Sequence, residues 1–345
     1  MDAIATVLPQ DVRVVAVVGC SKNAGKTTTL NALLEGLGGT LPRPGVLSIG
    51  IDGEEADFWL GVPKPRVEVA RGDWVATAEA ALAAGTAVVE VKERTGGRTL
   101  LGDLVVGQVV RAGTVLLAGI RAKDDVRAAV AAMLRLGAGR VLIDGAYQRL
   151  AAADPEVSDG TIIATGAVLG PTVDEVAGRT REFLQRLQVP ATTHAADRDL
   201  MATAVAANRL ALRLEGSGDP PVLAESPSAP EAAWILAGGD AVVAVPGAVG
   251  DDLVRQLAPR ATGRVRLLAQ DPTRLFLSPM ESSRFRRQHD LRVIRPIRVL
   301  AITANPFSVF GWTLPRPGMV EAIRAVAGNV DVLSFDVHPP PCPGA

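Results

Sequence analysis

The chain has 345 residues, of which 48% are hydrophobic and 21% charged, and its formal net charge is −1. A chain of this length is expected to form about two domains, and its apolar content excludes an intrinsically disordered protein. The balanced charge argues against proteins dominated by nucleic-acid binding or by attachment to anionic membranes. We therefore expect a globular protein with neither nucleic acid nor membrane among its partners.

Cysteine and histidine are scarce. The two cysteines, Cys20 and Cys342, exclude a disulfide framework, and the three histidines, His194, His289 and His338, lie too far apart for ligand spacing on one helix face. The N-terminus lacks a secretion signal, and no stretch offers about 18 uninterrupted apolar residues. These features predict a cytoplasmic protein without a His-rich metal centre.

Strands and helices alternate along the first half of the chain. Short apolar, β-branched runs predict strands at 12–18, 46–51, 86–91, 103–110, 114–120, 140–145 and 161–166. Helical periodicity predicts helices at 27–37, 75–84, 124–138 and 171–187, and Gly-Gly at 96–97 predicts a turn. The Gly- and Pro-containing stretch 53–75 reads as loop. This alternation is typical of an α/β fold, a doubly wound and mostly parallel sheet with helices on both faces.

The pattern changes near residue 190. Residues 215–230 are the richest in Gly, Pro and Ser and predict an exposed loop or linker. Around this loop we expect helices at 198–214, 249–258, 280–289 and 316–327 and strands at 241–246, 264–270, 298–303 and 330–335. The chain is therefore predicted to divide into domains 1–190 and 191–345, the second also α/β.

The sharpest motif is GCSKNAGKTTT, which begins at Gly19 and lies between a β-branched strand and an amphipathic helix. A Gly-rich turn before a helix N-terminus presents backbone N–H groups to phosphate oxygens. In the phosphate-loop motif of nucleoside triphosphatases, the lysine reaches the β- and γ-phosphates and the next hydroxyl binds Mg²⁺. The motif predicts that 1–190 is a P-loop nucleotide-binding domain for ATP and Mg²⁺. The expected nucleotide contacts are Gly19, Asn23, Ala24, Gly25, Lys26, Thr27 and Thr28.

The spacing of this loop is G-x5-G-K-T, one residue longer than the usual pattern, which would place a glycine at Cys20. The loop is similar to that of dethiobiotin synthetase and the cobyrinic-acid amidases, which share a P-loop class with MinD-type ATPases. The additional signature lysine of MinD-type ATPases would fall at Ser21 and is absent. No N-K-x-D guanine signature is present, which favours ATP over GTP modestly.

Two acidic positions follow predicted strands, where a P-loop enzyme places the carboxylate beside Mg²⁺. Asp144 ends the strand RVLIDG, and we favour a role near the metal over a turn-forming Asp-Gly pair. Asp52, with Glu54 and Glu55, follows the second strand, and a catalytic acid there and a solvated acidic loop are equally good interpretations. The predicted catalytic residues are Lys26, Asp52 and Asp144, and the predicted metal contacts are Thr27, Asp52 and Asp144.

Other sequence features are less specific for a function. D-V-H at 336–338 resembles the start of a cobalamin-binding motif, but Pro341 stands where that motif has glycine, so we reject the match. The basic segment 281–290 is interpreted as a solvated helix face rather than a docking surface. The aromatic segment 303–312 is interpreted as local core. The strand end at Thr165 and Gly166 is interpreted as an ordinary turn, with a nucleotide contact as the alternative.

A set of ordered segments adds a family resemblance. GKTTTLN, IDGEE, LLGDLVVGQVVRAGTVLLAGIRAKDD, LGAGRVLIDGA, SDGTIIATGAVLG, SPMESSRFR and VLAITANPFSVFGW occur in this order. Together they resemble the P-loop ATPase subunit of the reactivating system for adenosylcobalamin-dependent lysine 5,6-aminomutase and its ornithine-acting relatives, over most of 12–190 and about 275–335. The resemblance implies that Mg-ATP hydrolysis at Lys26, Thr27, Asp52 and Asp144 drives release of damaged cobalamin. It also implies that the second domain and 281–312 meet the aminomutase or a companion ATPase subunit.

Two other functions stay open from the residues. The loop spacing also occurs in ATP-dependent ligases that activate a small carboxylic acid, as dethiobiotin synthetase does. A third interpretation is a nucleotide-binding regulator with negligible turnover. The ATPase and the ligase differ in what stimulates turnover, a protein or a small carboxylic acid. Many proteins of this class dimerise across the nucleotide, so a homodimer is a further alternative, although the signature lysine that would support it is absent.

Overall fold

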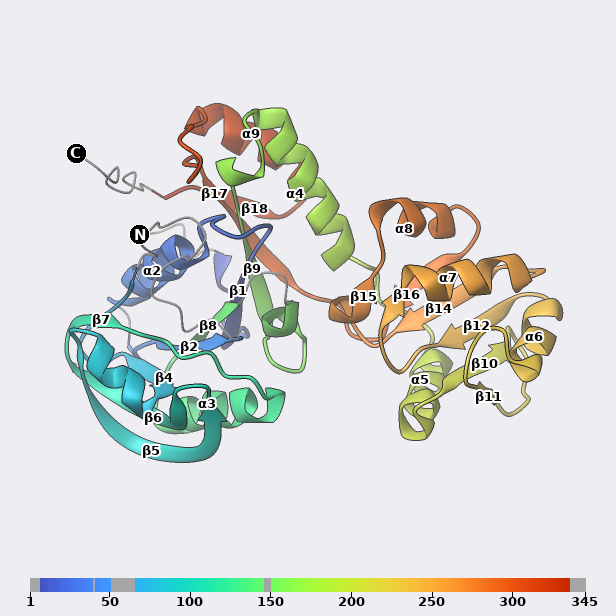
Figure 1. Ribbon diagram of the computed structural model, residues 1–345, viewed down its shortest axis with the longest axis horizontal. Coiled ribbons are helices and arrows are strands. Elements are labelled where there is room, and N and C mark those ends of the chain that lie inside the picture. Colours follow the sequence, from blue (N-terminus) through green and yellow to red (C-terminus); the bar gives the residue numbers. More distant parts are fainter. Residues whose placement is uncertain (1–6, 40, 51–65, 146–149, 336–345) are drawn as a thin grey trace. The chain divides into compact units, whose positions relative to one another are not determined.

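The computed structural model describes residues 7–39, 41–50, 66–145 and 150–335. The chain folds as two compact units (Figure 1). The first, unit 1, comprises residues 1–183 together with 298–345, and the second, unit 2, comprises residues 184–297. Both units are α/β.

Unit 1 is built on a nine-stranded sheet of order β18-β17-β9-β1-β8-β2-β4-β6-β5. Its strands are β1 (Val14–Gly19), β2 (Gly45–Ile49), β4 (Trp74–Ala78), β5 (Val88–Thr99), β6 (Gly102–Arg111), β8 (Val141–Gly145), β9 (Gly160–Gly166), β17 (Val299–Asn305) and β18 (Asp331–Leu333). All neighbours from β18 to β4 pair in parallel, whereas β6 is antiparallel to both β4 and β5. The sheet is therefore mostly parallel, as the sequence predicts. Two short strands, β3 (Val67–Val69) and β7 (Gly113–Val115), pair with each other.

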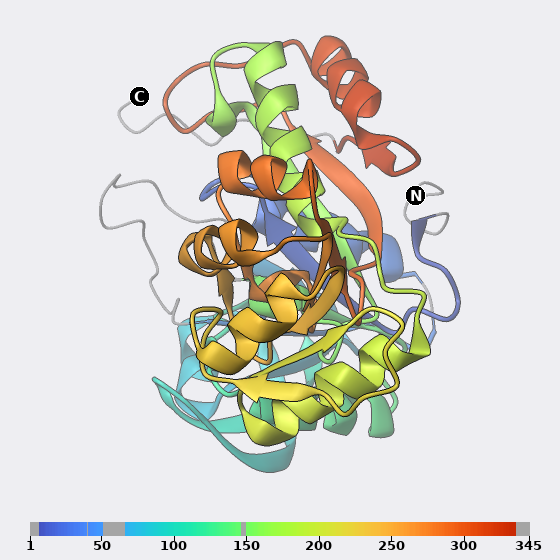
Figure 2. The same cartoon turned by 90° about the vertical axis from the view of Figure 1, so that its right-hand side faces the viewer.

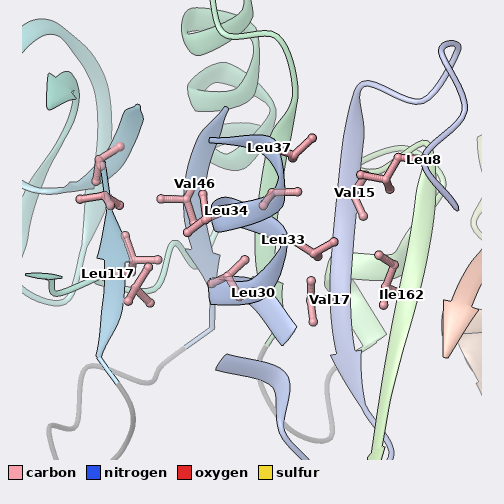
Figure 3. Close-up of a cluster of buried hydrophobic side chains, with 14 of the residues drawn as sticks. Leu8, Val15, Val17, Leu30, Leu33, Leu34, Leu37, Val46, Leu117 and Ile162 are labelled. Atoms are coloured by element: carbon pink, nitrogen blue, oxygen red, sulfur yellow. The ribbon is translucent and has the colours of Figure 1, made fainter. Parts of the chain in front are cut away.

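Helices cover both faces of this sheet. They are α2 (Lys26–Leu37), α3 (Lys123–Arg135), α4 (Val173–Leu187, whose last turn belongs to unit 2) and α9 (Arg316–Ala327), with 3-10 turns η1 (Glu79–Ala84), η2 (Leu150–Ala153) and η3 (Ala167–Leu169). Four leucines of α2 pack on β1, β2 and β9, namely Leu30, Leu33, Leu34 and Leu37 against Val15, Val17, Val46 and Ile162 (Figure 3). Side chains alternate along a strand, so Gly45 faces away from Val46. A Cβ on Gly45 would lie 2.9 Å from the Met133 sulfur, which places α3 on the opposite face.

Unit 2 contains a five-stranded sheet of order β11-β10-β12-β14-β16. Its strands are β10 (Leu210–Leu214), β11 (Val222–Ala224), β12 (Ala241–Ala244), β14 (Val265–Ala269) and β16 (Asp290–Val293), beside the short pair β13 (Val249–Gly250) and β15 (Leu275–Phe276). The strands β12, β14 and β16 are parallel, and β10 is antiparallel to its neighbours.

The helices of unit 2 surround its sheet (Figure 2). They are α5 (Ala195–Ala207), α6 (Pro230–Ala237), α7 (Asp251–Leu257) and α8 (Pro279–Arg286), with 3-10 turns η4 (Ala258–Arg260) and η5 (Pro272–Arg274). One apolar cluster joins α5 to the sheet, through Leu200 and Met201. A separate cluster joins α6, α7 and α8, for example Ile235, Leu257 and Phe285, so that each face of the sheet has its own core.

The predicted boundary at residue 190 lies close to the one observed, but the second domain does not extend to the C-terminus. The strand β17 pairs in parallel with β9, with Ile302 opposite Ile163, and β18 pairs with β17. Residues 298–335 therefore complete the sheet of unit 1. The sequence shows two α/β stretches in succession but carries no local signal for the strand order, because pairing between β9 and β17 is set by contacts far apart in the chain.

Three predictions within unit 1 are wrong. The strand predicted at 114–120 ends at Val115. The Ala-rich segment 75–84 is not an α-helix: its first part is β4, which lies between β2 and β6, and its second part is a 3-10 turn. Pairing on both edges outweighs the helical preference of alanine. The turn expected at 96–97 is also misplaced, because β5 continues to Thr99 and the hairpin turns at Leu100 and Leu101. Gly96 instead has a φ of 79° where the pairing register shifts.

In unit 2 the predicted helix 198–214 ends early. Its helix stops at Ala207, and Asn208, with a φ of 50°, adopts the left-handed conformation that ends helices. The chain then enters β10, and β11 interrupts the segment 215–230 that we expected to be loop. The segment 281–290 exposes Arg284, Arg286 and Arg287, as a solvated face requires, but buries Glu281, Phe285 and His289. In the described part of the chain, no helix is both long and apolar enough to span a membrane.

Candidate functional site

The loop of residues 20–25 joins β1 to α2 at the carboxyl edge of the parallel strands. Its start is fixed by a backbone hydrogen bond in which Cys20 N–H donates to Ala164 O of β9, at 2.9 Å. Asn23 and Gly25 have positive φ angles of 60° and 100°. This conformation turns the chain sharply, so that Lys26 begins α2 directly after the loop. The strand, loop and helix thus follow one another as the motif predicts.

The loop is folded closely onto its own ends. A Cβ on Gly19 would lie 2.9 Å from the Ser21 carbonyl oxygen and 3.0 Å from Lys26 Cγ. Gly19 therefore leaves space for the aliphatic stem of Lys26, which runs back across the end of β1. Of the predicted nucleotide contacts, Ala24 is fully buried, and Asn23, Lys26, Thr27 and Thr28 are partly exposed.

Asn305, at the end of β17, is a neighbour of the loop that the sequence does not predict. A Cβ on Gly25 would lie 3.0 Å from Asn305 Cβ and 3.2 Å from its Nδ2. A Cβ on Gly166, at the end of β9, would lie 2.8 Å from Asn305 O and 3.2 Å from Ala24 O. The loop and the ends of β9 and β17 therefore converge on one point. Asn305 ends an apolar run, as Asp144 does, but nothing local in the sequence places that run beside the loop.

Buried threonine pairs fix the elements around this point. Thr29 of α2 and Thr303 of β17 share a hydrogen bond of 2.6 Å between their hydroxyls. Thr165 of β9 and Thr180 of α4 share a second one of 2.7 Å, and the Thr180 hydroxyl is also within 2.7 Å of Val176 O. All four threonines are 3% exposed or less. The orientation of the strand ends relative to the helices is thus set by specific polar contacts as well as by apolar packing.

Asp144 lies at the same edge of the sheet, on the other side of β1 from β9. Its Cα is opposite those of Val17 in β1 and Ser48 in β2, and its Oδ1 is a buried atom. The structure therefore brings Asp144 to the edge at which Lys26 and Thr27 begin α2. The other predicted acids, Asp52, Glu54 and Glu55, lie outside the described residues.

The chemistry of this edge is compatible with phosphate and a magnesium ion. It offers turned backbone before a helix N-terminus, the Lys26 ammonium group, the Thr27 hydroxyl and the Asp144 carboxylate. Mg²⁺ in such sites is held by one or two carboxylates together with substrate phosphates. Among the residues described here, no group of three or more His, Cys, Asp or Glu side chains could hold a metal ion.

The Cys20 side chain is half-buried at the start of the loop. Burial raises the pKa of Cys20 to about 12, although hydrogen bonding to Thr165 and the nearby Lys26 charge act in the opposite direction. Since the thiolate is the reactive form, this shift keeps the thiol neutral at physiological pH and lowers its reactivity.

The aromatic segment 303–312 is only partly core. Thr303 and Ala304 are buried, but Asn305 is partly exposed and Phe310 is 56% exposed, contrary to the prediction. The D-V-H sequence at 336–338 lies outside the described residues. In comparisons with protein-family models, with curated proteins and with solved structures, none matched this chain.

Proposed function

We propose that this protein is a P-loop ATPase that binds and hydrolyses Mg-ATP at the loop 20–25. One observation carries the proposal: the loop turns through Asn23 and Gly25 at the end of a central parallel strand and delivers Lys26 and Thr27 to the first turn of α2. Backbone N–H groups and the helix dipole at this position favour a polyphosphate. Gly19 and Gly25 are needed because neighbouring atoms fill the space that side chains would take.

Each residue has a role in this proposal. The loop N–H groups hold phosphate oxygens, and Lys26 places its ammonium against the β- and γ-phosphates. Thr27 and Asp144 hold Mg²⁺, which neutralises charge developing on the phosphates when it is bound. Asp52 is the second acid of the proposal, positioning the metal or the attacking water.

We further propose that hydrolysis is coupled to a protein partner, an adenosylcobalamin-dependent lysine or ornithine aminomutase in the cytoplasm. The ATPase acts on this partner alone or together with a companion ATPase subunit. The ordered segments quoted above support this assignment. Release of a damaged cofactor requires that the ATP and ADP forms bind the aminomutase with different affinities.

The first experiment measures ATP hydrolysis by the purified chain, with and without an inactivated aminomutase. Lys26→Ala is the test variant, and Lys92→Ala, a partly exposed lysine of β5 paired with Glu90, is the matched control. We expect the partner to stimulate hydrolysis in the wild type and in Lys92→Ala but not in Lys26→Ala. Unchanged hydrolysis by Lys26→Ala would overturn the site.

The same assay distinguishes the proposed reactivase from an ATP-dependent ligase. Stimulation by a small carboxylic acid, with none by the aminomutase even when the companion subunit is added, would replace the reactivase with an ATP-dependent ligase. Slow hydrolysis that no partner changes would indicate a nucleotide-binding regulator.

A further inference from the structure

The segment after β17 forms a compact loop, residues 306–314, that the proposed phosphate site does not use. Phe307 and Thr313 form a bridge, Ser308 N–H donates to Trp312 O at 3.0 Å, and Leu314 N–H donates to Pro306 O at 3.0 Å. At its tip the rings of Phe310 and Trp312 stack with centroids 5.5 Å apart and an interplanar angle of 24°. The loop therefore holds an aromatic pair in a defined geometry.

Hydrogen bonds connect this aromatic pair to the ends of β9 and β17, which contact the phosphate loop. The Trp312 indole N–H donates to Ala167 O at 2.9 Å. Ala167 follows Gly166, whose Cα faces both Ala24 O and Asn305. Asn305 in turn accepts a hydrogen bond from Phe307 N–H at 3.2 Å, at the start of the aromatic loop. A short series of contacts thus links the aromatic pair to residues 24 and 25.

The composition of the loop restricts what it can bind. Residues 306–314 contain no charged side chain, so this segment is not a second phosphate site. Phe310 is 56% exposed although it is one of only seven phenylalanines in the chain. One exposed aromatic side chain covers much less than the roughly 800 Å² per partner of a stable protein interface, but its flat face matches one aromatic ring system.

The position of the aromatic loop indicates that its ligand is the base of a nucleotide. In open α/β sheets, ligands lie across the carboxyl ends of the strands. Asp144 and the proposed metal lie on the β8 side of β1, so the remainder of a nucleotide held at 20–25 extends over the β9 and β17 side. Resting on the proposed function, the geometry points to the Phe310–Trp312 pair as a stacking platform for the nucleobase, with the exposed ring of Phe310 in direct contact.

The test compares two ligands, Mg-ATP and Mg-tripolyphosphate, by isothermal titration calorimetry. Both carry three phosphates, but only ATP has a base. Stacking of a base on an aromatic ring typically changes affinity by about fivefold or more. We expect Phe310→Ala to weaken ATP binding about five- to tenfold and to leave tripolyphosphate binding within about twofold of wild type.

Two further variants serve as controls for Phe310→Ala. Phe310→Leu retains apolar bulk and should show the same selective loss, whereas Phe276→Ala, an equally exposed phenylalanine of unit 2, should change neither ligand. The stacking proposal would be overturned if Phe310→Ala bound ATP with wild-type affinity, or if it weakened binding of both ligands equally. Lys26→Ala tests the phosphate site independently of this result. Wild-type protein that binds neither ligand would overturn the proposed function itself.

Discussion

Thr29 and Thr303 share a buried hydrogen bond of 2.6 Å although 274 residues separate them in the chain. The bond joins α2, directly after the candidate phosphate loop, to β17, the strand that returns from beyond unit 2. It lies two residues from Asn305, which contacts Gly25. The position of the loop relative to β17 is therefore set by residues that are remote in sequence.

Breaking this pair is expected to destabilise unit 1. Thr303→Val leaves the Thr29 hydroxyl buried without this partner, which typically costs about 1–3 kcal/mol of unfolding free energy. The double variant Thr29→Val/Thr303→Val should lose less than the sum of the single losses, because the pair acts together. Chemical denaturation of all four proteins measures this coupling. Strict additivity would show that the hydrogen bond makes no net contribution.

Gly25→Ala is expected to weaken nucleotide binding by at least about tenfold. An alanine at a φ of 100° is strained by about 1–3 kcal/mol, and its Cβ would approach Asn305 to 3.0 Å. Gly96→Ala is the matched control, since Gly96 also has a positive φ but faces open space in β5. Equal ATP affinity in both variants would contradict the importance of the turn.

Asp144→Asn is expected to raise the Mg²⁺ concentration needed for half-maximal ATP hydrolysis more than Glu55→Gln does. The reason is that Asp144 lies beside β1 at the proposed metal position, and an amide is a weaker ligand for a hard cation than a carboxylate. Magnesium titrations of the two variants and wild type decide the order. The reverse order would assign the metal-side acid to the segment after β2.

His289 is expected to make unit 2 less stable in mildly acidic solution. Burial lowers the pKa of His289, and the Arg264 charge lowers it further. Below about pH 6.5 the unfolded chain takes up a proton that the folded chain resists, so stability falls as pH drops, by at most about 1.4 kcal/mol per pH unit. Above that pH the histidine is neutral in both states and contributes no slope.

The measurement is the unfolding free energy of wild type and His289→Gln between pH 5.5 and 7.5. The difference between the two proteins should shrink toward low pH, because glutamine takes up no proton. The variant also removes the His289 Nδ1 atom, which accepts a hydrogen bond from Val265 N–H at 3.2 Å. A pH-independent difference would mean that His289 ionises equally in the folded and unfolded chain.

Cys20 is expected to resist alkylation in the folded protein. With a pKa of about 12, its thiolate fraction at pH 8 is on the order of a thousandfold below that of an ordinary cysteine. In a Cys342→Ser background, iodoacetamide should modify Cys20 rapidly only after unfolding in denaturant. Equal rates in folded and unfolded protein would show that the thiol is not shielded.

The sequence predicts the core of the candidate site because its signals are local. The β-branched run ending at Gly19, the following loop and the leucines from Leu30 onward all fall within one strand–loop–helix unit, and each is observed. Asp144 is found in the same way, near the end of a buried strand. These patterns need no information about distant parts of the chain.

The rest of the site is missed because its determinants are non-local. Asn305 contacts Gly25 only after β17 has paired with β9, and no spacing in the sequence encodes that pairing. The helix predicted near residue 75 fails for the same reason, since two neighbouring strands decide its conformation. Asn208 is different: its left-handed conformation at a helix end was a readable local signal.

The interrupted course of unit 1 has a consequence for biosynthesis. Unit 2 is one continuous stretch, so all of its strands are synthesised before β17. Domains generally fold as units during synthesis. Unit 2 can therefore reach its final structure while the larger sheet still lacks its last two strands, and the contact between Asn305 and Gly25 forms only at the end of translation. A nascent chain stopped before residue 298 would carry the candidate phosphate loop but not the strand that positions it.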